Sequence, residues 1–382
     1  MDNRLVYHEV IPNNLKTSYG EFDVVDFTMS HPNRKLNIGS VRVEGEISVK
    51  YDAQFLNSDN VVDGTHINGK QIYLDHLVGS HGIAEQITCE INAGGNRQII
   101  ENLNEYPRFV KMASASTQGR NDMLNSNNVC ELKAPDNGIT NALLQGITPP
   151  TDPTISQRVD PDFSFRPLIC LNSGSGSLGY NKTGDIMLTL TLARTFALLH
   201  GNDVNAKVSY SIQNLRVRYT TSPMDDNNDT VVLKTKIAVK QSIQSSFANV
   251  QTRVPAVCTA MTASFQTQAN ENTAVNNNTD LNKVPSLTQT QFLFSNSTNT
   301  LISYILKNDS EVIDRAIDSM LDTGRNSLNV QTLANNNGFL LGINFDDAIS
   351  LADKPLSVQL QSAISSLVPM IIYMYFHSFV EL

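Results

Sequence analysis

Three segments of the chain carry residue types and spacings that could support chemistry, and the first is rich in glycine and serine. Residues 173–179 read Ser-Gly-Ser-Gly-Ser-Leu-Gly and are followed by Lys182 and Thr183, which suggests a phosphate-binding loop. In a Walker-type loop, Gly-Lys-Ser/Thr opens a helix, and the backbone amides of that helix surround the phosphate. Here Tyr180 and Asn181 stand between the glycine and the lysine, and a strand pattern follows. The segment is therefore more typical of a turn.

Two further segments carry atoms that metal ions bind. Asp75, His76 and His81 are close in sequence, but two histidines separated by four residues are not a zinc-binding spacing, and no cysteine pair completes a site. Histidines at a strand end and its turn explain this segment better. Residues 225–229, Asp-Asp-Asn-Asn-Asp, offer the oxygen ligands that calcium takes, but they lack the glycine and distal glutamate of an EF-hand loop. We therefore predict a solvated linker there, and neither a metal nor a cofactor for the chain.

The sequence shows no local arrangement of a catalytic nucleophile. It contains no Gly-x-Ser-x-Gly elbow. The four cysteines are far apart and form no Cys-x-x-Cys pair: Cys89, Cys130, Cys170 and Cys258. Because the N-terminus lacks the apolar stretch of a secretory signal, we expect reduced thiols made in a cytosol-like compartment. We predict no catalytic residues and no enzyme, although any Asp or Glu could supply the two carboxylates of a glycoside hydrolase.

Charge and hydropathy argue against two further classes of protein. The 382 residues include 28 Lys and Arg against 37 Asp and Glu, a formal net charge of −9, without a basic cluster. Nucleic-acid binding depends on Lys and Arg that displace counterions, so direct nucleic-acid binding is not expected. No apolar run approaches the roughly 20 residues of a membrane-spanning helix. The longest such run, residues 368–376, is typical of a buried strand.

Neutral amides take the place of charges in this composition. The chain contains 41 asparagines, and charged residues make up 17% of it, below the about 25% of ordinary soluble domains. Amides cost less to desolvate than ions and can pair reciprocally across an interface. Such a surface suits closed, repeated assembly. It also suits a lectin-like module, because amides are good partners for sugar hydroxyls.

Alternation of apolar and polar residues predicts a protein made mainly of strands. In residues 41–50, valine and isoleucine alternate with charged and polar residues, as in a strand with one buried and one solvated face. In residues 208–219 the alternation slips by one position after Ile212, which indicates a bulge. Further strands are expected at residues 70–74, 85–91, 165–171, 186–192, 231–239, 256–265, 287–294, 339–345, 356–364 and 369–380.

Helix signals are few. Asn308 and Glu311 form a capping box, apolar residues follow at helical spacing, and Gly324 supplies a stop. A second helix is expected after the two glycines at 94–95, ending before Pro107. Two helices among about a dozen strands do not make β-α-β units, so we predict an all-β fold built from sandwiches.

The composition divides the chain into three parts. Residues 1–30 lack strong periodicity and are expected to form an N-terminal arm. Residues 31–222 are expected to form a β-sandwich, and residues 223–382 a second β-rich domain that includes the last strand. The boundary follows from the turn-forming residues at 222–229. As an alternative, one domain is inserted in the other, with N-terminal strands pairing with the strand at 369–380.

Four stretches carry a resemblance to a known family. They are Glu-Tyr-Pro-Arg at 105–108, Asn-Leu-Arg-Val-Arg-Tyr at 214–219, Gln-Thr-Arg-Val-Pro-Ala at 251–256 with Ala-Ser-Phe-Gln at 263–266, and Ile-Tyr-Met-Tyr-Phe-His-Ser at 372–378. Together they resemble the minor capsid (penton) proteins of virophages and related polinton-like viruses. The resemblance implies a jelly-roll β-sandwich that stands normal to the shell, with a second β-rich domain and few short helices.

The same resemblance implies a structural role in a virion. Five copies would form a homopentameric penton at each five-fold vertex of an icosahedral capsid, beside trimers of double jelly-roll major capsid protein, after assembly in the host cytoplasm. Major capsid proteins of this family are longer, so a chain of 382 residues is expected to be too short to resemble them. Two other functions stay open: a receptor- or glycan-binding β module and, less expected, a carbohydrate-active enzyme.

Overall fold

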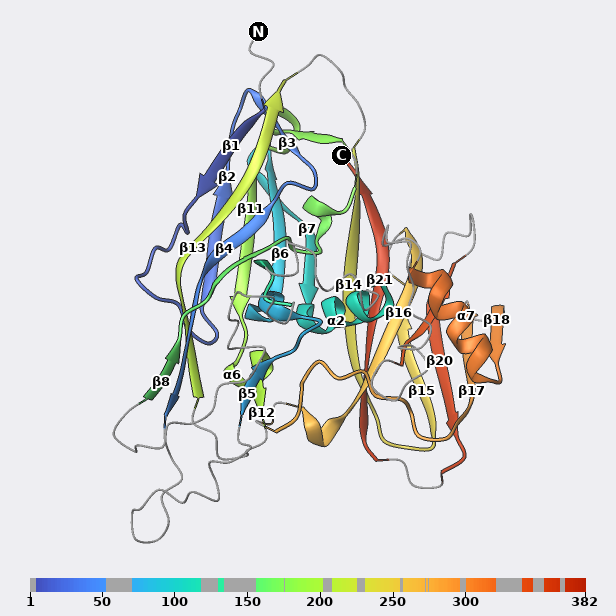
Figure 1. Ribbon diagram of the computed structural model, residues 1–382. Coiled ribbons are helices and arrows are strands. Elements are labelled where there is room, and N and C mark those ends of the chain that lie inside the picture. The colour runs from blue at the N-terminus through green and yellow to red at the C-terminus, as the bar shows by residue number, and fades with distance from the viewer. Residues whose placement is uncertain are drawn as a thin grey trace, which may run out of the picture.

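The computed structural model shows a protein built mainly from antiparallel sheets (Figure 1). It describes residues 5–52, 71–117, 130–133, 156–174, 176–201, 208–224, 231–254, 257–271, 273, 275–295, 300–320, 339–345, 354–364 and 368–382. The all-β prediction is confirmed, and the sheets pack as sandwiches.

A first sheet, here called the N-terminal sheet, forms the outer layer of the first sandwich. Its longest strand, β13 (Val208–Pro223), pairs antiparallel with β4 (Arg42–Asp52) on one side and with β1 (Val6–Val10) on the other. The remaining described strands of this sheet are β3 (Arg34–Asn37), β8 (Ser156–Val159), β9 (Asp162–Phe165) and β10 (Ser177–Gly179).

A second sheet, the central sheet, runs through the whole molecule. Its described strands follow the order β2 (Val24–Met29), β11 (Asp185–Leu192), β6 (Ala84–Ala93), β7 (Asn96–Asn104), β14 (Val232–Ile243), β21 (Met370–Glu381), β16 (Cys258–Thr267) and β19 (Leu341–Asn344). Neighbouring strands are antiparallel except β7 and β14, which are parallel and meet where Asn102 is opposite Ile237. This pair joins a half-sheet from the first part of the chain to a half-sheet from the second part.

A third sheet, the C-terminal sheet, covers the second half of the central sheet. Its described strands follow the order β15 (Phe247–Arg253), β20 (Pro355–Ser362), β17 (Leu287–Ser295) and β18 (Thr300–Leu306). The other described elements are the strand pair β5 (Ile72–Leu74) and β12 (Leu199–Gly201), the helices α2 (Tyr106–Thr117), α5 (Tyr180–Thr183), α6 (Thr195–Leu198) and α7 (Asp309–Met320), and the 3-10 turns η1 (Gly79–Ile83), η3 (Cys170–Asn172) and η4 (Gln268–Asn270).

Two hydrophobic cores lie on opposite faces of the central sheet. On β21, Tyr373 and Tyr375 belong to the core shared with the N-terminal sheet. Their neighbours Met374 and Phe376 belong to the core shared with the C-terminal sheet. Successive side chains of a strand point to opposite faces. The N-terminal sheet and the C-terminal sheet therefore cover opposite faces of the central sheet, each over a different half of it. This explains why residues 370–376 are apolar without alternation: the strand is buried on both faces.

Two local predictions are confirmed. The pairing of β13 with β4 shifts between Gln213 and Arg216, and Asn214 has a left-handed φ of 53°, which is the expected bulge. At the start of α7, the backbone N–H of Glu311 donates to Asn308 Oδ1 at 2.9 Å. The Glu311 carboxylate accepts from the N–H of Lys307, one residue earlier than in a regular capping box.

The helix predicted after the two glycines is wrong. Gly94 and Gly95 have φ of 60° and 86° and form a two-residue turn, with Ala93 paired to Asn96, so residues 96–104 form the return strand β7. The helix begins only at Tyr106. Its second residue is a proline, which a first helical turn accepts because the N–H there has no partner within the helix.

Two other predictions need adjustment. The strand expected at 165–171 is wrong for most of its length, because β9 ends at Phe165 and η3 begins at Cys170. Within the expected arm at 1–30, the structure shows two paired strands, β1 and β2, each at the edge of a sheet. The division of the chain at residue 222 stays a prediction, since strands from both sides of it share the central sheet.

We predict that Gly184→Ala destabilises the protein by more than about 2 kcal/mol. Gly184 precedes β11 with a φ of 61°, and a Cβ there would collide with the carbonyl oxygen of Asn92. Chemical denaturation followed by circular dichroism measures the change. The matched control is Gly20→Ala, where a Cβ meets nothing within 4 Å. Equal stability of the two variants would contradict this explanation.

Candidate functional sites: a buried junction and an exposed flank

Helix α2 lies at the seam between the two sandwiches. It follows β7 directly and packs against β21 of the second half-sheet (Figure 1). The ring of Phe109 is 5.3 Å from that of Tyr375, and the guanidinium of Arg108 lies 3.9 Å above the ring of Tyr373. One face of the helix therefore carries both apolar and cationic side chains into the interior.

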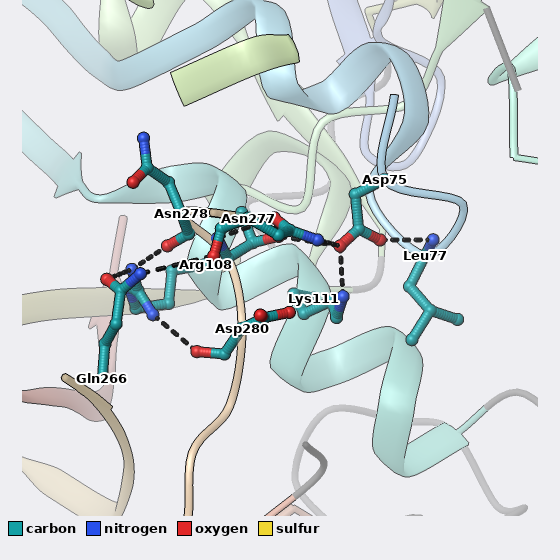
Figure 2. Close-up of polar contacts among 9 residues, drawn as sticks. Asp75, Leu77, Arg108, Lys111, Gln266, Asn277, Asn278 and Asp280 are labelled. Atoms are coloured by element: carbon teal, nitrogen blue, oxygen red, sulfur yellow. Dashed lines mark hydrogen bonds and ion pairs between the residues drawn. The ribbon is translucent and has the colours of Figure 1, made fainter. Parts of the chain in front are cut away.

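Arg108 connects α2 to the second half of the chain. Its Nη1 donates to the carbonyl oxygen of Asp280 at 3.1 Å. Its Nη2 donates to Gln266 Oε1, on β16, and to the carbonyl oxygen of Asn278 (Figure 2). The residue is 3% exposed, so these acceptors replace water around a buried cation.

Asp75, which follows β5, receives hydrogen bonds from donors in both halves of the chain. Its Oδ2 accepts from Lys111 Nζ of α2, from Asn277 Nδ2 and, at 2.8 Å, from Thr279 Oγ1. Its Oδ1 accepts from the backbone N–H of Leu77 at 2.8 Å (Figure 2). Burial alone would raise the pKa of Asp75, but the Lys111 ammonium and these hydrogen bonds hold that pKa well below its ordinary value. We call these residues, with Arg108 and its acceptors, the junction cluster.

The structure separates the residues of the candidate metal segment. Asp75 belongs to the junction cluster, whereas His76 is exposed. His81 Nδ1 lies 2.6 Å from Tyr106 Oη, and its Nε2 lies 3.2 Å from a Glu131 carboxylate oxygen. Among the described residues, no group of three or more His, Cys, Asp or Glu side chains could hold a metal ion.

The other segments examined for chemistry have structural surroundings or lie outside the described residues. Residues 177–179 form β10 and pair with β3, and Lys182 lies within α5, which is a single helical turn. The acidic segment 225–229 lies outside the described residues. Cys89 and Cys170 are buried. In the described part of the chain, no helix is long and apolar enough to cross a membrane.

A cavity of about 360 Å³ opens where β7 and β14 diverge, with Glu85 and Glu105 in its wall. Burial, together with the charge of Glu105, raises the pKa of Glu85. Lys240 binds Glu105 at 3.0 Å and also contacts Glu271. Lys240 therefore forms ion pairs with two carboxylates at the edge of this cavity.

Exposed apolar side chains gather along the edge of the first sandwich that β1 and β2 form. Tyr7 and Leu15 are 79% and 68% exposed. We call this edge the N-terminal flank; its large exposed apolar residues are Leu5, Tyr7, Ile11, Leu15, Phe22 and Val24. Both strands have an unpaired side in the described sheets. Edge strands and apolar side chains together are typical of a surface that another protein covers.

Two neighbouring histidines connect the N-terminal flank to β13. The rings of His8, on β1, and His31 are 3.8 Å apart. His8 Nε2 lies 2.8 Å from Thr221 Oγ1, and His31 Nε2 lies 2.8 Å from Tyr219 Oη, both on β13. Burial, with the charge of Arg34 nearby, lowers the pKa of both histidines.

We predict that β1 loosens as the pH falls from about 7.5 to about 5. The folded state favours neutral His8 and His31, so it binds fewer protons than the unfolded chain. Stability is therefore complete above the unfolded-state pKa of about 6.5 and declines below it. Hydrogen–deuterium exchange of residues 6–10, corrected for intrinsic rates, measures the effect. A variant with His8→Gln and His31→Gln should show a smaller pH response, and an unchanged response would contradict the assignment.

We also predict that Arg108→Met lowers the free energy of unfolding by about 3 kcal/mol or more. The substitution keeps the stem of the side chain but leaves the buried acceptors of the junction cluster without their donor. Arg97→Met is the control, because Arg97 is on the exposed part of β7, and it should cost less than about 1 kcal/mol. Denaturant unfolding of both variants tests the difference. Similar free energies of unfolding for the two variants would show that the junction cluster contributes little to stability.

Comparisons with known proteins agree with this architecture. No family model matches the chain, and no curated protein matches its sequence. Among solved structures, the chain is similar over 100% of its length to VP54 of PBCV-1, a crystal structure fitted into a cryo-EM reconstruction of the virophage Sputnik, with 10% identity, 95% of that chain covered and a TM-score of 0.59. The Faustovirus major capsid protein matches over 99% of this chain and 90% of its own, with 9% identity and a TM-score of 0.56.

The mavirus major capsid protein gives a third match, over 98% of this chain and 90% of that chain, with 8% identity and a TM-score of 0.54. The fold is thus that of jelly-roll viral capsid proteins. The expectation that 382 residues are too few to resemble a major capsid protein is wrong, since nearly the whole of each matched chain is covered.

Proposed function

We propose that this chain is a shell-forming capsid protein of a virus and that it occupies the position of a major capsid protein. The observation that carries the proposal is the match of both sandwiches, along the whole chain, to proteins described as major capsid proteins. In this role the protein resides in the virion and its partners are copies of itself. Assembly takes place in the host cytoplasm.

The junction cluster suits such a role. A shell subunit meets its neighbours at fixed angles, so its two sandwiches must keep one relative orientation. Buried cations on α2 bind acceptors from both halves of the chain, and separating the halves would leave charges without partners. The two sandwiches therefore behave as one rigid block.

Two sandwiches in each chain also suggest how copies associate. In a closed ring of head-to-tail contacts, one edge of a subunit meets the opposite edge of the next. Three copies would place six sandwiches around the axis. The N-terminal flank is one edge of the block, and the C-terminal sheet lies at the other (Figure 1). Covering the apolar side chains of the flank would stabilise each contact.

We predict that the purified protein forms trimers and that Tyr7→Ser combined with Phe22→Ser weakens them by at least about tenfold, since both substitutions remove apolar area from the flank. Native mass spectrometry over a dilution series gives the stoichiometry and the dissociation constant. Ile99→Ser is the control, because Ile99 is 58% exposed on β7, away from the flank. A protein that stays monomeric and never enters shells when co-expressed with the other virion proteins would contradict the proposal.

A penton remains the second candidate, and the sequence resemblance favours it. Native mass spectrometry separates the two candidates, because a penton would give five copies. The described parts of the stretches that carry the resemblance lie at the start of α2, in the bulged part of β13, and in β15, β16 and β21. These stretches support the fold but carry no information on the number of copies. A glycan-binding module would instead sediment as a monomer and bind a glycan array.

A further inference from the structure

The junction cluster brings an amine and a carboxamide from distant parts of the chain together. Lys111 Nζ and Asn277 Nδ2 both donate to one oxygen, Asp75 Oδ2, so the two nitrogens lie no farther apart than two hydrogen-bond lengths (Figure 2). The side chains of Lys111 and Asp75 are 7% and 6% exposed. Water therefore has little access to the amine of Lys111 or to the carboxylate of Asp75.

The carbonyl group of the same carboxamide is polarised. Asn277 Oδ1 accepts from the backbone N–H of Thr279 at 3.0 Å and lies 2.7 Å from Thr279 Oγ1. Donors aimed at a carbonyl oxygen stabilise the negative charge that develops there when a nucleophile adds to the carbon. The cluster thus holds a nucleophile, an electrophile, an oxyanion donor and a carboxylate that touches both nitrogens.

We propose that Lys111 and Asn277 form an intramolecular isopeptide bond once the chain has folded, with Asp75 transferring the protons. The bond links α2 to the segment after η4 and so ties the two sandwiches together covalently. The inference does not depend on the number of copies in a capsid. It rests on chemistry within one chain.

The reaction balances without any added reagent. Asp75 Oδ2 takes a proton from the Lys111 ammonium, and the free amine adds to Cγ of Asn277, whose oxygen keeps its hydrogen bond from Thr279 N–H. Asp75 then protonates Nδ2 and accepts a proton from the attacking nitrogen. The Cγ–Nδ2 bond breaks and ammonia leaves, taking up that proton as ammonium. A Lys ammonium and an Asn carboxamide become one secondary amide and one ammonium ion, and Asp75 returns to a carboxylate.

The hydrogen bonds to Asp75 make this a slow reaction. They favour the ionised carboxylate and so slow the proton transfer to Asp75 that frees the amine. Burial acts in the opposite direction, because two ions are costly in the interior and the neutral pair is not. We expect a single conversion per chain, completed after folding brings residues 75, 111 and 277 together.

The test is the intact mass of the purified, folded protein. The expected mass is that of the sequence minus one molecule of ammonia. After denaturation and trypsin digestion, a branched peptide should join Lys111 to Asn277, and trypsin should not cut after Lys111. Lys236 is an internal control, since it is also buried but has no carboxamide partner among its hydrogen bonds. Trypsin should cut after it normally.

Two variants distinguish ammonia lost through this isopeptide bond from ammonia lost by other reactions. Lys111→Arg keeps a cation beside Asp75 but cannot form the bond, and it should have its full mass. Asp75→Asn keeps the shape but removes the proton carrier and should also have its full mass. The wild-type measurement needs no variant to fold.

Three results would overturn the proposal. One is a folded wild-type protein at its full mass with cleavage after Lys111. Another is loss of ammonia in Lys111→Arg as well, which would indicate a succinimide at Asn277. The third is loss of water in place of ammonia, which would join Lys111 to Asp75 instead.

Discussion

The burial of two cations on α2 is the constraint on which the rest of the architecture depends. The central sheet passes from one sandwich to the other through the parallel pair β7–β14, whose register covers one pair of residues. So short a pairing resists bending only weakly. Helix α2 supplies the missing connection in two ways. Arg108 donates to acceptors that all come from the second half of the chain, and Lys111 pairs with Asp75, which also accepts from Asn277 and Thr279 of the second half. The polar interior therefore fixes the angle between two apolar cores.

This arrangement changes the meaning of the amide-rich composition. The excess of asparagine suggests a surface that neighbouring subunits cover, but some of these asparagines form hydrogen bonds inside the molecule. Asn277 and Asn278 satisfy buried charges and backbone groups inside the molecule. The surface best suited to a partner is instead apolar and lies along the β1–β2 edge. Amide groups thus complete the hydrogen bonds around the buried charges of the junction cluster, whereas apolar side chains mark the N-terminal flank.

The strands could largely be predicted, because alternation reports directly on a half-buried strand. The bulge in β13 and the cap of α7 were also visible locally. The helix predicted after Gly94 and Gly95 is wrong because a glycine pair can either precede a helix or form a hairpin turn, and only the pairing of Ala93 with Asn96 decides between the two.

The junction cluster had no comparable signal in the sequence. Asp75 stood out only beside two histidines, whereas its true partners are 36 and about 200 positions away. The sequence positions of Arg108, Lys111 and Asn277 do not predict that these residues meet, since each is an ordinary polar residue in its own segment. For the same reason the sequence does not predict that one central sheet runs through both sandwiches. Contacts between residues far apart in the chain depend on the whole fold and leave no local periodicity.

The position of β21 has a consequence for the order of synthesis. This strand lies between β14 and β16 and gives side chains to both cores, yet it comprises residues 370–381. The second sandwich cannot close until β21 has been synthesised, whereas the strands of the first sandwich all lie within residues 6–223. The edges of β14 and β16 that pair with β21 therefore stay uncovered until residues 370–381 leave the ribosome. Chaperones that cover such edges would act on the second half of the chain while the first sandwich is already folded.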